Sequence, residues 1–256
     1  MDPYVVVASG FRAGWRALRL DVRSTAHANI PRRGPAILAS NHVGYLDFCF
    51  VALAPPPPRR RVRFLARDDF FEGRVVGGAL RAMQQIPVDV HGDPTTAFAA
   101  AEAALARGEV VGVHPEGTIS PSFVPRRGRT GTVRLALRTG APIVPVAVWG
   151  SQRLLTKWQP KRLRTGACVS VRYGEPWHPP ADVPPAVSTA ELMRRIGDLL
   201  AREQAAYPQQ PRDAEDRWWL PAHLGGTAPT PEEAERRLRE QAAARRAARR
   251  DGTGAD

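Results

Sequence analysis

Three short segments of this chain carry side chains that can do chemistry, and the first holds a histidine and an aspartate. The segment ILASNHVGYLDF places His42 after an apolar run and Asp47 five residues later. Five residues of an ideal α-helix turn about 500°, so a pair with this spacing cannot meet on one helix. The pair can meet if His42 lies in a strand-to-helix loop, with Gly44 easing the turn, and Asp47 lies in the first turn of the next helix. Asp47 then accepts a hydrogen bond from one imidazole nitrogen and leaves the other nitrogen as a base.

The other two segments combine an apolar run with a turn or with proline. VVGVHPEGTISPSF leads into Glu116, Gly117 and Thr118, and a glycine-containing turn after a strand exposes N–H groups that can hold an anion. TGAPIVPVAVWG contains Pro142 and Pro145, and proline within a strand predicts an edge strand or a bulge. Taken alone, the three segments are more typical of a structural histidine, an ordinary loop with a capping acid and a plain strand.

Apolar runs and helical patterns alternate along the chain and predict the elements that position these segments. The predicted strands cover residues 36–39, 62–66, 110–113, 143–148 and 167–173. The predicted helices cover residues 48–54, 74–83, 95–106 and 132–138, and a later one, capped by Ser188 with Glu191 three residues on, runs to about Ala206. This alternation predicts an α/β fold, a single domain with a largely parallel mixed sheet flanked by helices.

Both ends of the chain are expected to be helical. Residues 4–20 repeat apolar side chains at spacings of three and four, with arginines beside them. Such an amphipathic helix either lies on a membrane surface or packs against the domain's own core, and the sequence leaves both open. Residues from Glu232 onward form a charged helical tail. We therefore divide the chain into a membrane-facing helix, an α/β domain and a proline-rich, then helical extension, at 1–22, 23–206 and 207–256.

The composition indicates a partner with many negative charges. The net charge is +12, with 37 Lys and Arg against 25 Asp and Glu. A membrane of anionic lipid fits this charge, whereas nucleic acid is not expected, because no basic-aromatic recognition motif accompanies it. Only Cys49 and Cys168 are present, so no disulfide framework is expected. Neither a signal peptide nor an apolar run of about 18 residues is visible, so no membrane-spanning helix is expected.

Together, in this order and spacing, the three segments resemble the motifs of the 1-acylglycerol-3-phosphate acyltransferases, a family of glycerolipid acyltransferases. The matching runs are NHxxxxD from Asn41 to Asp47, PEGT at 115–118 and APIVPVAV at 141–148. The resemblance extends over about residues 10–206. It implies a single α/β acyltransferase domain whose active site faces the membrane.

For the first motif the resemblance implies catalysis. His42 is the implied general base, Asp47 orients and polarises it, and Asn41 supports the same motif. The implied reaction moves a fatty acyl group from a thioester of coenzyme A or acyl carrier protein to the free hydroxyl of 1-acylglycerol-3-phosphate or a related lysophospholipid, within phospholipid biosynthesis. This transfer needs no metal and no bound cofactor. The protein is then expected to lie peripherally on the cytoplasmic face of the membrane.

For the other motifs the resemblance implies binding roles. Glu116, Gly117 and Thr118 match the motif that holds the acyl acceptor. Pro142 and Pro145 match the motif that shapes the region of the acyl donor. The implied partners are therefore a membrane surface, a lysolipid acceptor and an acyl thioester.

Three positions differ from the family pattern, and a fourth is a candidate to replace a missing arginine. Ile119 stands where the family's PEGTRS motif has arginine, and Val90 stands where arginine commonly follows the IPVD-type segment. Both arginines are associated with the acceptor's phosphate, so the head group of the acceptor stays open. Arg129 is the best candidate to replace them. His114, in place of phenylalanine or tyrosine, is either a satisfied core histidine or a polar contact to the acceptor. The missing arginines keep a second function open, a non-catalytic membrane- or lipid-binding protein with a degenerate site.

Overall fold

One mixed sheet forms the centre of the fold in the computed structural model, which describes residues 2–54, 60–89, 94–159 and 164–250. Within these residues seven strands pair in the order β1-β7-β6-β2-β5-β3-β4. The strands are β1 (Asp21–Thr25), β2 (Ala36–Ser40), β3 (Val62–Arg67), β4 (Ile86–Val88), β5 (Val110–Val113), β6 (Ile143–Trp149) and β7 (Cys168–Tyr173). The short strands β1 and β4 were not among the predicted elements.

Helices surround this sheet. In the described part of the chain the α-helices are α1 (Pro3–Ala17), α2 (Asp47–Leu53), α3 (Arg74–Ala82), α4 (Pro94–Ala106), α5 (Gly131–Thr139), α6 (Pro185–Ala205) and α7 (Pro231–Arg250). Short 3₁₀ helices are η1 (His27–Asn29), η2 (Asp68–Phe71), η3 (Ser151–Arg153), η4 (Glu215–Trp219) and η5 (Ala222–Leu224).

The strand directions confirm the predicted, largely parallel α/β sheet. β6, β2, β5, β3 and β4 all run parallel to their neighbours in that group. β7 pairs antiparallel with β6, and β1 pairs parallel with β7. Because β2, β5 and β6 are parallel neighbours, the loops after their carboxyl ends open at the same edge of the sheet, where parallel α/β folds place their ligands.

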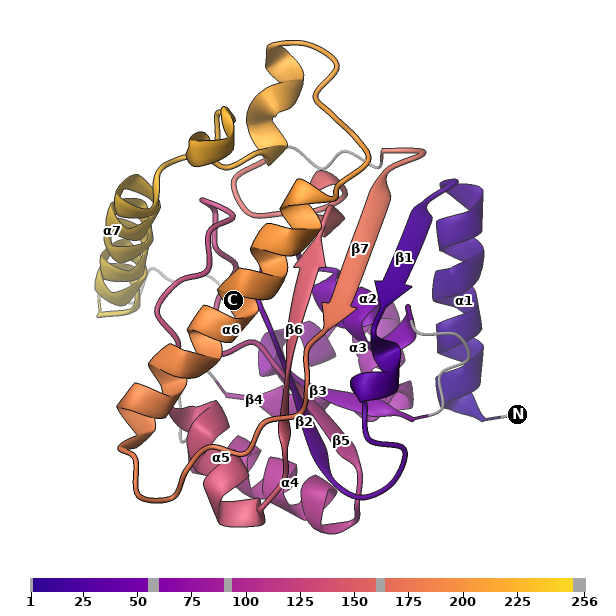
Figure 1. Ribbon diagram of the computed structural model, residues 1–256, viewed down its shortest axis with the longest axis vertical. Helices are drawn as coiled ribbons and strands as arrows, with labels where there is room; N and C mark the ends of the chain where they lie inside the picture. The colour runs from indigo at the N-terminus through magenta and orange to yellow at the C-terminus, as the bar shows by residue number, and fades with distance from the viewer. Residues whose placement is uncertain (1, 55–59, 90–93, 160–163, 251–256) are drawn as a thin grey trace.

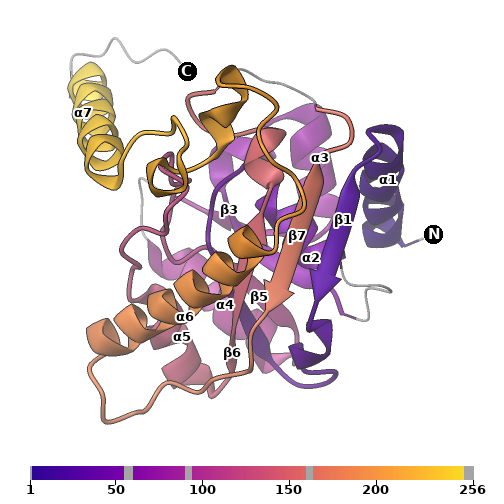
Figure 2. The ribbon, with the colours of Figure 1, turned by 45° about the horizontal axis from the view of Figure 1, so that its top comes forward.

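Helices cover both faces of the sheet. Figures 1 and 2 show α6 lying diagonally across one face, with α4 and α5 beside its lower end. α2 packs against β6 and β7 on the other face, where α1 and α3 also pack against each other. β2 is buried along its whole length, and alternate side chains join different core clusters. Ala36 and Leu38 join the cluster that contains Phe50 of α2, whereas Ile37 and Ala39 join the one that contains Leu192 of α6.

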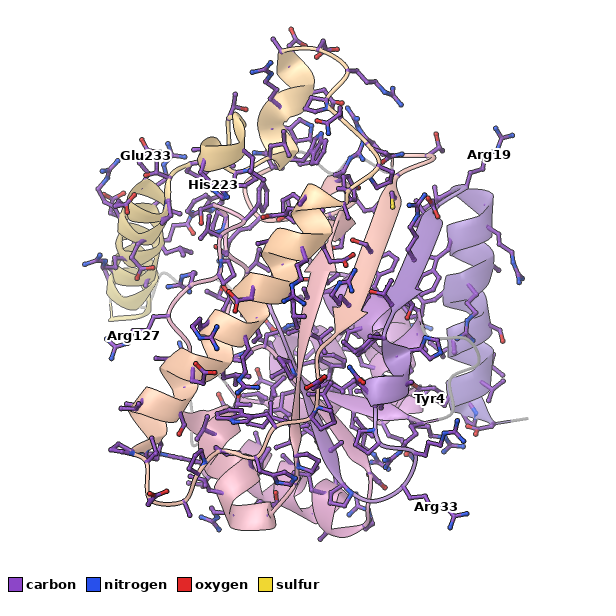
Figure 3. All side chains as sticks on the ribbon, viewed as in Figure 1. Tyr4, Arg19, Arg33, Arg127, His223 and Glu233 are labelled. Carbon is purple, nitrogen blue, oxygen red and sulfur yellow. The ribbon has the colours of Figure 1, made fainter. Side chains whose placement is uncertain are left out.

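The N-terminal helix packs against the domain's own core along one side. Its N-cap is Asp2, whose Oδ1 accepts a hydrogen bond from Tyr4 N at 3.0 Å. Tyr4 and Ala8 are buried in the core cluster of α2, and Figure 3 shows Tyr4 at the start of this helix. α1 ends at Ala17, earlier than predicted, because the chain turns into strand β1 at Asp21. The domain boundary at residue 22 stays a prediction.

Pro145 lies inside the sheet, so the expectation of an edge strand at this proline is wrong. β6 lies between β2 and β7, and Pro145 pairs with Ala39 of β2. The carbonyl of Pro145 accepts a hydrogen bond from Gly174 N at 2.7 Å. The backbone N–H and C=O of one strand residue point toward the same neighbouring strand. The N–H group that proline lacks would therefore face β7, just beyond Tyr173, the last residue of β7. The proline therefore removes no ladder bond from the middle of the sheet.

The C-terminal part of the chain covers the core and then forms a charged helix. Trp219 is 1% exposed and packs against Trp149 and Tyr207. α6 begins at Pro185, so the predicted cap at Ser188 is wrong, because the preceding prolines already fix the first turn of the helix. A capping box instead begins α7, where Thr230 N donates to Glu233 Oε2 and Glu233 N donates to Thr230 Oγ1.

Candidate active site

His42 and Asp47 meet across the loop between β2 and α2. β2 ends at Ser40, His42 follows in the loop, and Asp47 is the first residue of α2. His42 Nδ1 donates a hydrogen bond to Asp47 Oδ2 over 2.9 Å. The side chain of Asp47 is fully buried, whereas that of His42 is 19% exposed. This geometry fixes the imidazole and leaves Nε2 as the ring nitrogen that can act as a base.

Asp47 is held by donors from two parts of the chain. Its Oδ2 also accepts hydrogen bonds from Val43 N at 2.7 Å and Gly44 N at 2.9 Å. Its Oδ1 accepts one from the hydroxyl of Ser151, in η3 just after β6. Sequence reasoning missed Ser151, which lies 104 residues away along the chain. The sequence showed only that Ser151 follows a predicted strand, and the pairing of that strand with β2 comes from the structure.

Gly44 is needed for close approach rather than for an unusual backbone angle. A Cβ atom at this position would lie 3.0 Å from Leu155 O and 3.2 Å from Ser151 O. Gly44 is not among the residues with positive φ, so the sequence-based reason for this glycine is wrong. A larger residue would push the His42–Asp47 turn away from the segment that holds it.

Asn41 fixes the start of the His42 loop to the neighbouring strand β6. Its Nδ2 donates to Val148 O at 2.9 Å, and its Oδ1 accepts from Val148 N at 2.8 Å. Asn41 is fully buried. These contacts are structural, and the part of Asn41 in the first motif stays a prediction.

Glu116 holds the backbone of His42 in place. Its Oε1 accepts a hydrogen bond from His42 N at 2.8 Å, and its Oε2 accepts one from Arg126 N at 2.9 Å. The residue is 2% exposed, and burial raises the pKa of Glu116 to about 8, against the opposing effect of these two N–H groups. Ser120 N also donates to His42 O at 2.8 Å, so the loop after β5 holds both backbone groups of His42. Contact of Glu116 with an acceptor stays a prediction.

Gly117 and Thr118 form the exposed turn of that same loop. Gly117 has a φ of +70°, a value that glycine adopts without strain, and its N donates to His114 O at 2.9 Å. A Cβ atom on Gly117 would lie 2.9 Å from Arg129 Nε, so the Arg129 side chain lies against this glycine. Lys157 Nζ donates to Thr118 Oγ1 at 3.1 Å, a contact that sequence reasoning missed. The predicted acceptor-binding residues therefore lie together on the segment between β5 and α5, which holds the backbone of His42.

His114 stacks on the candidate base. Its ring lies parallel to that of His42, with 4.0 Å between centroids and 3° between planes. Its Nδ1 lies 3.0 Å from Ser40 Oγ. Burial, together with the nearby His42, lowers the pKa of His114 to about 3, so this ring is uncharged at neutral pH. An uncharged ring supports His42 without opposing its protonation.

The remaining predicted residues lie outside the immediate site or outside the described residues. Pro142 O accepts a hydrogen bond from Ile37 N at 2.9 Å, and Pro145 lies within β6. Their influence on an acyl donor stays a prediction. Ile119 is 3% exposed. Val90 lies outside the residues that the structure describes.

A partly exposed histidine lies in front of a buried aspartate, at the carboxyl end of a parallel strand, and forms a candidate general-base site on an α/β fold. A sequence profile of the acyltransferase family matches residues 21–149, about half of the 256 residues. The chain belongs to this family of acyltransferases. The match contains all of the His42–Asp47 and Glu116–Thr118 segments.

Individual relatives agree with this assignment. An uncharacterized protein of Mycobacterium tuberculosis is 36% identical over 138 residues, which cover 49% of this chain and 36% of the relative. The chain thus matches little more than a third of that relative's length. The 1-acyl-sn-glycerol-3-phosphate acyltransferase of Bacillus subtilis is 26% identical over 189 residues, 72% of this chain and 90% of the relative.

A solved structure shares the fold. The 1-acyl-sn-glycerophosphate acyltransferase PlsC of Thermotoga maritima aligns with a TM-score of 0.68 and 20% identity, over 80% of this chain and 81% of that one. The resemblance to 1-acylglycerol-3-phosphate acyltransferases is thereby confirmed in sequence and in fold.

Proposed function

We propose that this protein transfers a fatty acyl group from an acyl thioester to the free hydroxyl of 1-acylglycerol-3-phosphate or a related lysophospholipid. The main support for this proposal is the hydrogen bond between His42 Nδ1 and buried Asp47. It orients the imidazole so that Nε2 can act as a base, in a chain of the acyltransferase family. The activity in the name of the Bacillus subtilis relative supports a glycerolipid acceptor. The proposed donor is a thioester of coenzyme A or acyl carrier protein.

The proposed reaction uses His42 first as a base and then as an acid. A hydroxyl group is too weakly acidic to attack a thioester at neutral pH unless its proton is removed as the new bond forms. Nε2 of His42 takes that proton while the acceptor oxygen bonds to the acyl carbon, and the Asp47 carboxylate stabilises the resulting imidazolium. The carbon–sulfur bond then breaks, and the same proton passes to the departing sulfur. General acid–base catalysis of this kind contributes roughly 10²–10⁴-fold.

Transfer is proposed to be direct, without an acyl group on the enzyme. Cys49 is the cysteine nearest to His42 in sequence, and it lies inside α2 with no exposed surface. Burial raises the pKa of its thiol well above the ordinary value, which suppresses the reactive thiolate. Donor and acceptor therefore need to occupy the site together.

The test is release of free thiol from palmitoyl-CoA by the purified chain, in the presence of a panel of lysolipids. We expect release that depends on the acceptor, with the best acceptor identifying the head group. Release that is equally fast without any acceptor would instead indicate a thioesterase. No release with any donor or acceptor would leave the alternative, a lipid-binding protein with a degenerate site.

We also propose that the protein binds the membrane surface through an apolar patch on α1, η2 and α3. These elements carry most of the large apolar side chains that are exposed, namely Val5, Val6, Phe70, Val75 and Val76. α1 packs against α3, and α3 packs against η2. Exposed arginines lie among these residues, at Arg67, Arg74 and Arg81. Exposed apolar side chains with arginines on the same elements suit an anionic bilayer surface, although Arg67 also pairs with Asp69. In the described residues no helix is long and apolar enough to cross a bilayer.

Replacing Val75 and Val76 together by aspartate is expected to weaken binding to vesicles of phosphatidylglycerol and phosphatidylcholine by about tenfold or more, because two apolar anchors are lost. Their side chains are 84% and 56% exposed, so folding is expected to be unchanged. Deleting α1 would be a poorer test, since Tyr4 and Ala8 are buried in the core. Co-sedimentation measures the bound fraction.

The matched control for this experiment is Val187→Asp. Val187 is 57% exposed and lies in the first turn of α6, on a different element. It is expected to leave vesicle binding unchanged. Equal binding by the double variant, the control and the unchanged chain would show that the patch does not contact lipid.

A further inference from the structure

The two positions where the family carries phosphate-associated arginines supply no cation here. Ile119 is apolar and 3% exposed, and Val90 is apolar by sequence. A phosphorylated acceptor would still bring a negative charge of nearly two units to the site. The negative charge of the phosphate therefore needs cationic side chains from other segments of the chain.

Two cationic side chains from separate segments lie at the exposed turn of the loop after β5. The ammonium of Lys157 donates to Thr118 Oγ1 at 3.1 Å. The Arg129 side chain lies against Gly117, where a Cβ atom would meet Arg129 Nε at 2.9 Å. Both cations are therefore adjacent to the same two-residue turn, and Lys157 approaches it from a segment 39 residues further along the chain.

The segment that carries Lys157 is bound along the His42 loop. The hydroxyl of Ser151 donates to Asp47, Tyr45 N donates to Leu155 O at 3.0 Å, and Thr156 Oγ1 donates to Val43 O. These contacts fix the backbone immediately before Lys157 against the catalytic loop. On the other side, Glu116 and Ser120 hold the backbone of His42. An anion at Gly117–Thr118 would thus lie beside the candidate base.

We propose that Lys157 and Arg129 form the binding site for the phosphate group of the acceptor, with the Thr118 hydroxyl as a third donor. This inference rests on the proposed function and assigns its acceptor a phosphate head group. Lysine provides a compact charge and arginine a planar pair of donors. Because Thr118 Oγ1 accepts from Lys157, its own proton is directed elsewhere and can be donated to a phosphate oxygen. Lys157 and Arg129 then bind the acceptor phosphate in place of the two family arginines.

The first experiment measures binding of 1-hexanoylglycerol 3-phosphate, a soluble acceptor analogue, by isothermal titration calorimetry. Lys157→Ala and Arg129→Ala are each expected to weaken binding by about 10–100-fold, the effect of losing one charge-assisted hydrogen bond. Lys157→Gln is expected to weaken it similarly, since glutamine keeps a donor for Thr118 but removes the charge. Arg127→Ala is the matched control, because Arg127 belongs to the same loop but points outward in Figure 3.

The same variants are then compared in thiol release, with a phosphorylated acceptor and with an uncharged monoacylglycerol. The expected result is a raised KM for the phosphorylated acceptor, with little change in kcat or in the KM of the thioester. Normal binding of the analogue by Lys157→Gln would show that Lys157 only ties the two segments together, and would overturn the proposal. Equal losses with the uncharged acceptor, or in Arg127→Ala, would overturn it as well. Lysine-dependent binding of the analogue without any thiol release would keep the phosphate site and reject acyl transfer.

Discussion

His42→Ala is expected to lower the rate of acyl transfer by about 10²–10⁴-fold, because no other group replaces the base that removes the hydroxyl proton. The neighbouring His114 is a poor substitute, since burial lowers its pKa to about 3. Thiol release with saturating acceptor and donor measures the loss. We expect kcat to fall much more than the KM of either substrate changes, because the imidazole acts mainly in the transition state.

Folding of His42→Ala is expected to change little. The ring is partly exposed and makes one hydrogen bond, to Asp47, which keeps its donors from Val43, Gly44 and Ser151. A stability loss of about 1 kcal/mol is expected. His223→Ala is the matched control, because His223 is an exposed histidine on η5, away from this loop. Transfer that persists in His42→Ala at the rate of this control would assign the base to another residue.

Asp47 substitutions are expected to separate the charge of this residue from its structural contacts. In Asp47→Asn the amide oxygen can still accept from Val43 N and Gly44 N, and the amide nitrogen can donate to Ser151 once the hydroxyl of Ser151 turns round. The fold is therefore expected to survive. Transfer is expected to fall by about 10²–10⁴-fold, because a neutral amide does not stabilise the imidazolium.

Asp47→Ala is expected to damage the fold as well. It leaves the buried N–H groups of Val43 and Gly44 without their acceptor, and a loss of about 3–5 kcal/mol in the free energy of unfolding is expected. Urea unfolding measures this loss, and thiol release measures activity at a temperature where both variants remain folded. An Asp47→Ala protein as stable as Asp47→Asn would show that the turn does not depend on these hydrogen bonds. An Asp47→Asn protein with normal activity would show that transfer does not require the negative charge of Asp47.

Much of the fold followed from local pattern. The predicted strand at 110–113 coincides with β5, and the predicted helix at 74–83 differs from α3 by one residue. These segments have continuous apolar or amphipathic patterns, which the core then buries. β1 was missed because its residues are mostly polar and none is fully buried, and β4 was missed because it has only three residues. Such strands form because a neighbouring strand offers free backbone groups, which local sequence does not reveal.

The candidate site was also predicted only in part from the sequence. By itself the sequence determined that a histidine follows a strand and that an aspartate begins the next helix, because both depend on spacing within one motif. That Glu116, Gly117 and Thr118 belong to the same site was implied by the resemblance to the acyltransferase family, since Glu116 comes 74 positions after His42. Only the tertiary structure decided that Ser151 holds Asp47, that Glu116 holds the backbone of His42, and that Lys157 reaches Thr118. These contacts join residues 39 to 104 positions apart, across loops that meet only because parallel strands end at one edge of the sheet. Pairing of the strands, rather than any local preference, therefore decided which polar side chains surround the candidate base.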